Sequence, residues 1–128
     1  MESLRRAIEA RDADAVEALL AADVVFRSPA LFKPYAGRAA TMIVLRAAME
    51  VFEDFRYTRT FTDDAGGGSV MLFAANVGGK SLEGVDVLSV GEDGLITEFR
   101  VMIRPLSGLV ALAEAMAPRV SGPLEGLG

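Results

Sequence analysis

The sequence predicts an α+β protein, in which one curved antiparallel sheet wraps around helices. Three observations lead to this fold class. Apolar residues at helical spacing dominate the first half of the chain, and alternating segments joined by glycine-rich links dominate the second half. With 128 residues, the chain has room for one sizeable core. Helices and a sheet that each have one apolar face bury these faces against each other.

Two helices are expected at the start of the chain. Residues 2–10 form the first, and its apolar face carries Leu4, Ala7 and Ile8. Asp12 offers an N-cap for the second helix, which we expect to run to about residue 22. A short strand is expected at residues 23–29, where a proline ends it.

The longest helix is expected at residues 38–52, after a loop with one proline and one glycine. Its apolar positions, Met42, Leu45, Met49 and Phe52, recur every three or four residues. Four strands follow, at residues 55–62, 69–77, 80–90 and 95–104. The links between them are short and contain glycine, which is typical of consecutive antiparallel hairpins.

The end of the chain is expected to differ from the rest. Residues 106–116 form a closing amphipathic helix. The tail, residues 118–128, is rich in proline and glycine, and we expect it to fray or to lie over a neighbour. We therefore expect one domain, residues 1–117, followed by this tail.

The composition excludes several kinds of function. The net charge of −5 argues against nucleic acid or an anionic membrane as a partner. The chain has no Cys and no His, so thiolate chemistry, Ser-His-Asp triads and nearly all zinc sites are excluded. A general base must then be an Asp, Glu, Lys, Tyr or terminal amine. We expect no metal and no cofactor. The chain shows no membrane-length apolar run and no signal peptide, so a cytoplasmic location is expected.

One acid interrupts an apolar strand in the stretch "EGVDVLS", which contains Asp86. One face of this strand carries Leu82, Gly84, Asp86, Leu88 and Val90, and the other carries Glu83, Val85, Val87 and Ser89. Both faces are mixed, so alternation alone leaves open whether Asp86 points to solvent or into the core.

A family resemblance favours the inward direction. The chain resembles the nuclear transport factor 2-like superfamily, a cone-shaped α+β fold whose members include ketosteroid isomerase, limonene epoxide hydrolase and SnoaL-like polyketide cyclases. The resemblance covers nearly the whole chain up to the last helix. It rests on "RDADAVEALLAADVVFRSP", on "YAGR" before the long helix and on "GVDVLSVGEDGLITEFRVM". It implies a curved sheet around a central apolar pocket, while the superfamily covers many activities.

The catalytic residues of these families are only partly matched. Asp86 falls where ketosteroid isomerase keeps the carboxylic acid of its oxyanion hole. Ser28 stands at the position of that family's general base, and Leu4 at the position of its first oxyanion tyrosine. The final-strand acid of the hydrolases and cyclases falls at about Val101. These replacements argue against steroid isomerisation by that family's route.

The resemblance also implies a set of pocket residues. Asp86 is the expected catalytic acid or base, and Ser28 and Tyr57 are expected to position the substrate or a water molecule. The expected substrate-binding residues are Ser28, Tyr57, Phe26, Leu45, Met49, Phe52, Phe73, Leu88, Phe99, Val101 and Ile103. Burial in this pocket should raise the pKa of Asp86, because desolvation disfavours the carboxylate.

Two functions remain open at this stage. One is an acid/base enzyme of the isomerase, cyclase or hydro-lyase type, acting through Asp86 on a hydrophobic small molecule. The other is a non-catalytic module that binds a hydrophobic ligand or only dimerises. Members of the superfamily commonly pair through the outer face of the sheet, so we expect a homodimer. That face would carry Val85, Val87, Arg100, Met102 and Arg104.

Overall fold

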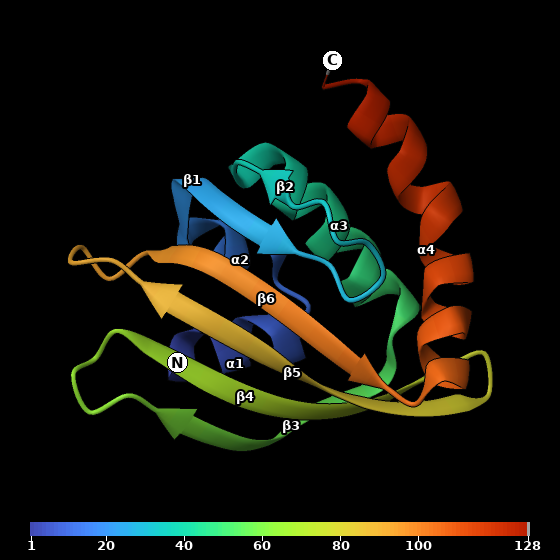
Figure 1. Cartoon of the computed structure of the whole chain (residues 1–128), viewed down its shortest axis with the longest axis horizontal. Helices are drawn as coiled ribbons and strands as arrows, with labels where there is room; N and C mark the ends of the chain where they lie inside the picture. The colour runs from blue at the N-terminus through green and yellow to red at the C-terminus, as the bar shows by residue number, and fades with distance from the viewer. Residues whose placement is uncertain (128) are drawn as a thin grey trace.

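The computed structural model describes residues 1–127 and confirms the α+β fold class (Figure 1). Ten elements follow in the order α1 (Glu2–Glu9), α2 (Ala13–Ala18), β1 (Leu20–Arg27), β2 (Tyr35–Ala36), α3 (Arg38–Val51), β3 (Glu53–Thr62), β4 (Gly68–Val77), β5 (Lys80–Val90), β6 (Ile96–Arg104) and α4 (Leu106–Glu125). None of the helices in this part of the chain is both long and apolar enough to cross a bilayer.

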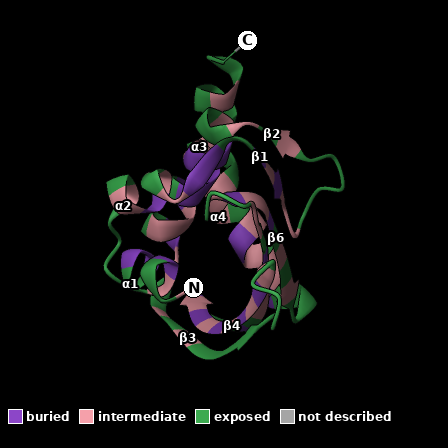
Figure 2. Cartoon of the chain, turned by 90° about the vertical axis from the view of Figure 1, so that its left-hand side faces the viewer, coloured by how far each residue is buried: buried purple, intermediate pink, exposed green. Residues whose placement is uncertain are grey.

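All six strands belong to one sheet with the order β2-β1-β6-β5-β4-β3. The predicted antiparallel meander from β3 to β6 is confirmed. The short strand β1 lies parallel to β6, and β2 pairs antiparallel with β1. In Figure 2 the sheet is curved, and the helices lie on its concave side. The concave face of the sheet therefore forms one wall of the interior.

Alternation along the strands decides which side chains enter this interior. On β4, buried and half-exposed residues alternate from end to end. On β4 the inward residues are Phe73, as the family resemblance implied, together with Met71, Ala75 and Val77, all at most 4% exposed. On β6, Phe99 is buried while Arg100 and Met102 are exposed on the convex face. A homodimer formed through this convex face stays a prediction, which the molar mass in solution tests.

The boundary between α2 and β1 differs from the prediction. Asp12 does cap α2, since its Oδ1 accepts a hydrogen bond from the backbone N–H of Ala15 at 3.1 Å. The helix ends at Ala18, however, and the strand begins at Leu20 rather than at residue 23. The Ile96 N–H donates to the Leu19 carbonyl at 2.8 Å, and Leu20 pairs with Ile96. Pairing with β6 thus overrides the helical propensity of this leucine- and alanine-rich stretch.

The tail also differs from the prediction, because α4 continues to Glu125 with Pro118 and Pro123 inside it. This helix packs along α3, and Arg119 forms an ion pair with Glu50 on α3 at 3.4 Å. Packing on one side supports the helix although each proline removes a backbone donor. Most of residues 117–127 are exposed (Figure 2). Position 128 of the predicted tail lies outside the described residues.

Candidate functional site

A mainly apolar cavity of about 80 Å³ lies between the concave face of the sheet and the helices. Its lining comes from α1, β1, α3, α4 and the four strands of the meander. Ten of the predicted pocket residues line it, namely Phe26, Leu45, Met49, Phe52, Tyr57, Phe73, Asp86, Phe99, Val101 and Ile103. An apolar cavity with few polar groups is the usual form of a small-molecule site.

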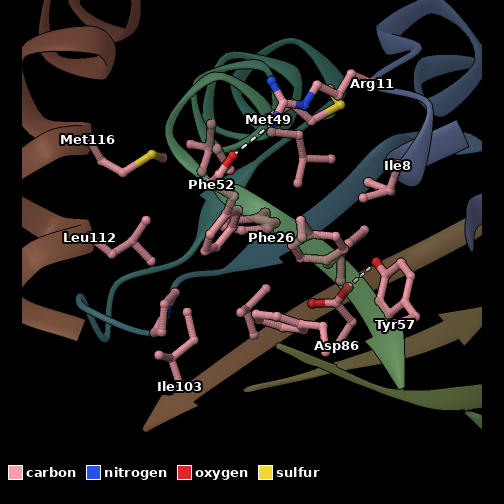
Figure 3. Close-up of a pocket in the computed structure, with 18 residues that line it drawn as sticks. Ile8, Arg11, Phe26, Met49, Phe52, Tyr57, Asp86, Ile103, Leu112 and Met116 are labelled. Atoms are coloured by element: carbon pink, nitrogen blue, oxygen red, sulfur yellow. Dashed lines mark hydrogen bonds between the residues drawn. The ribbon is translucent and has the colours of Figure 1, made fainter. Parts of the chain in front are cut away.

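Asp86 is the acid of this cavity. It lies on β5 between Met71 of β4 and Val101 of β6, and it is 5% exposed. Its Oδ2 accepts a hydrogen bond from the Tyr57 hydroxyl at 2.5 Å, and in Figure 3 the other carboxyl oxygen points away from Tyr57 into the cavity. Burial raises the pKa of Asp86 to about 7, and the bond from Tyr57 offsets part of that rise by lowering it.

Tyr57 acts as the fixed donor to this acid. Its backbone N–H donates to Oε2 of Glu9 on α1 at 3.0 Å, which ties β3 to the first helix. Burial, and then the charge of Asp86, raise the pKa of Tyr57 well above its ordinary value. Tyr57 therefore keeps its proton near neutral pH and can only donate to the Asp86 carboxylate.

Aromatic packing holds Tyr57 in place. Its ring lies edge-on to Phe55, with ring centres 5.0 Å apart, and edge-on to Phe73. Phe55 stacks on Phe73 at 5.0 Å, and Phe52 packs against both. Such pairs contribute beyond the apolar area that they bury. These ring contacts therefore hold the Tyr57 side chain so that its hydroxyl points at Asp86.

Two predicted pocket residues do not line the cavity. Ser28 lies just beyond the end of β1 at Arg27, so the alternation that was expected to point it inward has already stopped. Its Oγ accepts hydrogen bonds from the backbone N–H groups of Ala30 and Leu31 at 3.0 and 3.4 Å, as in a local turn. Leu88 does point inward, yet it is 2% exposed and belongs to the packed core beside the cavity.

The structure also adds residues that the sequence did not place at the site. Ile8, Leu112 and Met116 were predicted only as helix positions, and α1 and α4 bring them to the cavity. Pro29 lines it where Ser28 was expected. Arg11 lines it as well, and nothing in the sequence pattern indicated this, because it stands alone in the turn after α1.

The described residues contain no group of three or more acids that could hold a metal ion. Within the cavity lining of residues 1–127, Asp86 is the sole acid and Arg11 the sole cationic side chain. The chemistry that this site can perform is therefore proton transfer, hydrogen bonding and charge pairing.

The structure is that of a small α+β protein with a buried acid in an apolar internal cavity, and comparison with known proteins gives the family. The model of the SnoaL-like domain matches residues 1–99. The chain therefore belongs to this family, within the nuclear transport factor 2-like superfamily. A search of the curated proteins finds no match.

Solved structures agree with this assignment. A steroid delta-isomerase from Pseudomonas aeruginosa is 42% identical with a TM-score of 0.87, and the alignment covers 94% of this chain and 88% of that one. An uncharacterised protein with a cystatin-like fold from Silicibacter pomeroyi is 34% identical with a TM-score of 0.87, over 92% and 82% of the chains. A putative polyketide cyclase from Pseudomonas putida shares the fold, at 17% identity and a TM-score of 0.67, over 85% and 91%.

Proposed function

We propose that the protein is an acid/base enzyme of the isomerase, cyclase or hydro-lyase type, which moves a proton on a hydrophobic small molecule. The observation that carries this proposal is the environment of Asp86. It is a buried carboxyl in an apolar cavity, with Tyr57 as its hydrogen-bond partner and a pKa of about 7. A carboxyl with such a pKa is present in both protonation states near neutral pH, which suits a general acid or base.

The proton moves in two balanced steps. The Asp86 carboxylate takes a proton from the bound substrate through the oxygen that faces the cavity, and the electron pair of the broken bond stays on the substrate. The same carboxylic acid then returns the proton to another atom of the substrate. Throughout, Tyr57 donates to Oδ2 and stabilises the ionised form of Asp86 without losing its own proton. The apolar lining disfavours water beside the intermediate.

The similarity to a steroid delta-isomerase supports this reaction class, because moving a double bond next to a carbonyl is a proton transfer. The general base of ketosteroid isomerase is replaced by Ser28, which has no carboxyl group. Asp86 is the one acid in the described lining, so it would both remove and return the proton. The cavity of about 80 Å³ is smaller than the roughly 150 Å³ that holds benzene in an apolar protein cavity. A ring-sized ligand would therefore displace adaptable side chains, and Met49 and Met116 in the lining are suited to this.

A second candidate is a non-catalytic protein that binds a hydrophobic ligand. The observation that favours it is the single acid in the cavity, since many acid/base reactions use a separate acid and base. In that case Asp86 and Tyr57 would serve only to hydrogen-bond a polar atom of the ligand.

The test is the isomerisation of a small β,γ-unsaturated cyclic ketone in D₂O, followed by NMR for both double-bond shift and deuterium uptake. We expect wild-type protein to accelerate the double-bond shift with little deuterium in the product, because Asp86 returns the proton that it has taken. Asp86→Asn and Asp86→Leu should lower the rate by about a hundredfold or more. Asp93→Asn is the matched control, because Asp93 accepts a backbone hydrogen bond in an exposed turn away from the cavity.

Each outcome separates the two candidates. Turnover that persists in both Asp86 variants removes Asp86 from catalysis. Ketone binding to the wild type without turnover or deuterium uptake supports the non-catalytic candidate.

A further inference from the structure

Arg11 brings a positive charge to the rim of an otherwise apolar cavity. It is exposed and yet lines the cavity, where Asp86 is the one other charged residue in the described lining. The backbone of Arg11 has φ 55°, an uncommon conformation for a residue other than glycine. Its N–H donates to the Ile8 carbonyl at 3.0 Å, so the turn that ends α1 fixes the point from which the side chain extends.

The guanidinium of Arg11 has one intramolecular task. Its Nη2 donates to the carbonyl oxygen of Phe52, the residue that follows α3, at 3.0 Å (Figure 3). This bond satisfies a carbonyl at a helix C-terminus. A guanidinium has five N–H donors in a planar fork, so this tether leaves most of them available.

No carboxylate neutralises Arg11 among residues 1–127, where its guanidinium forms no ion pair within 4.0 Å. The acids nearest to it in sequence are engaged elsewhere. Glu9 binds Arg5 with one oxygen and the N–H of Tyr57 with the other. Asp12 caps α2. The positive charge of Arg11 is therefore directed at the cavity rim without an internal counter-ion.

We propose that Arg11 binds a carboxylate of the natural ligand, so that the molecule which occupies this cavity in its functional state has an apolar body with an acid group at one end. The inference rests on the proposed function only in taking the cavity as the ligand site. A planar guanidinium pairs with a carboxylate through two parallel hydrogen bonds. The tether to Phe52 holds the fork at the rim, which lowers the entropy lost on binding.

The two charges of the cavity also set the direction of the ligand. In Figure 3 the Arg11 side chain lies at the top of the view, where it bonds Phe52, and the pair formed by Asp86 and Tyr57 lies at the bottom. A carboxylate placed next to ionised Asp86 would meet a like charge in an apolar surrounding, which is costly. A carboxylate at Arg11 meets the opposite charge. The acid group therefore stays at the rim, and the apolar body points inward toward Asp86.

The experiment compares matched acids and amides as ligands. Phenylpropanoate, phenylpentanoate and phenylheptanoate are titrated into the full-length protein, each beside its neutral amide, and calorimetry gives the dissociation constants. Three chain lengths are used because the linker must span from the cavity to the rim. We expect wild-type protein to bind the best-fitting acid about tenfold more tightly than its amide.

Two variants separate ligand recognition from the structural tether. Arg11→Gln keeps a donor for the Phe52 carbonyl but removes the charge, and Arg11→Met removes both. Both should lose the tenfold preference for the acid while amide affinity stays within about twofold. Arg56→Gln is the control, because Arg56 also donates to a backbone carbonyl, that of Asp54, but does not line the cavity.

The outcomes distinguish this inference from the proposed function. If acid and amide bind wild type equally, or if the preference survives in Arg11→Gln, Arg11 is only a tether and the inference fails while the cavity remains a ligand site. A preference that is lost equally in Arg56→Gln also contradicts it. If no acid and no amide binds, the inference fails and the cavity as a site for such molecules fails with it. Loss of ketone turnover in the Asp86 variants would still support the acid/base proposal.

Discussion

The Tyr57 hydroxyl donates to Oδ2 of Asp86 at 2.5 Å, and this bond reaches from β3 to β5 over the intervening strand β4. The two residues stand 29 positions apart in the sequence. Tyr57 pairs with Phe73, and Asp86 pairs with Met71, so β4 sets the spacing between them. The register of three strands thus gives a buried carboxyl one defined donor and leaves its other oxygen toward the cavity.

The first prediction concerns the pH dependence of stability. The pKa of Asp86 is about 7 in the folded protein, against an ordinary value of 3.8. Because the folded-state pKa is raised, the stabilising contribution is fully present below about pH 4 and is lost as the pH rises through about 7. The free energy of unfolding should fall over this window by on the order of 4 kcal/mol, as measured by urea denaturation.

Asp86→Asn is the control for this effect, because an amide of similar shape does not ionise. The difference in unfolding free energy between the variant and the wild type should grow as the pH rises. A difference that does not change with pH would show that Asp86 titrates in its ordinary range and would contradict the burial argument.

The second prediction concerns Tyr57→Phe. The hydrogen bond from Tyr57 lowers the pKa of Asp86 against the larger effect of burial. Removing the hydroxyl should therefore raise the pKa of Asp86 further above about 7, since the carboxylate loses its donor. NMR of carboxyl carbons across a pH titration measures this directly. Tyr35→Phe, the other tyrosine of the chain and not part of the cavity lining, should leave the titration unchanged, and an equal shift in both variants would refute the role given to Tyr57.

Much of the fold could be predicted from periodicity. The order of the helices and of the four meander strands was correct because each carries a clear apolar pattern and glycine-rich turns bound the strands. A strand was correctly predicted in the region of β1, but its start could not be predicted locally, because the strand begins inside a helix-favouring stretch and depends on pairing with β6. The helical end of α4 was missed because Pro118 and Pro123 usually end helices, whereas packing along α3 supports this one.

The candidate site also contains residues that the sequence could predict and residues that it could not. Residues in regular alternation, such as Phe73, Asp86 and Phe99, were placed correctly once the family resemblance fixed the inward face. Alternation failed at Ser28, which lies past the end of its strand. Arg11 was missed because no periodic pattern governs a turn, and its direction depends on the tertiary contact with Phe52.

The third prediction concerns Ser28→Ala. If Ser28 faced the ligand, its removal would weaken ligand binding or turnover. In the structure its hydroxyl instead accepts bonds from the turn that follows β1, and it does not line the cavity. We expect a loss of about 0.5–1.5 kcal/mol in unfolding free energy and no change in ligand affinity. A several-fold loss of affinity at unchanged stability would return Ser28 to the site.

The fourth prediction compares two glycines of α4. A Cβ at Gly108 would lie 2.7 Å from the Leu82 Cβ and 3.0 Å from the Ser81 carbonyl oxygen, so α4 approaches β5 closely there. Apart from its chain neighbours, a Cβ at Gly122 meets nothing within 4 Å. Gly108→Ala should lower the unfolding free energy by about 1–3 kcal/mol through overpacking. Gly122→Ala should change it by no more than about 0.5 kcal/mol, because the gain in helix propensity is opposed by the contact of a Cβ with the ring of Pro123.

Urea denaturation of the two variants checks this contrast, since the same substitution is made in the same helix. Because Leu112 and Met116 of α4 line the cavity, displacement of the helix in Gly108→Ala should also weaken binding of the best phenylalkanoate amide, while Gly122→Ala should not. If both substitutions change the unfolding free energy by similarly small amounts, α4 is not packed against β5 at Gly108, and the wall that it gives to the cavity is not fixed at that point.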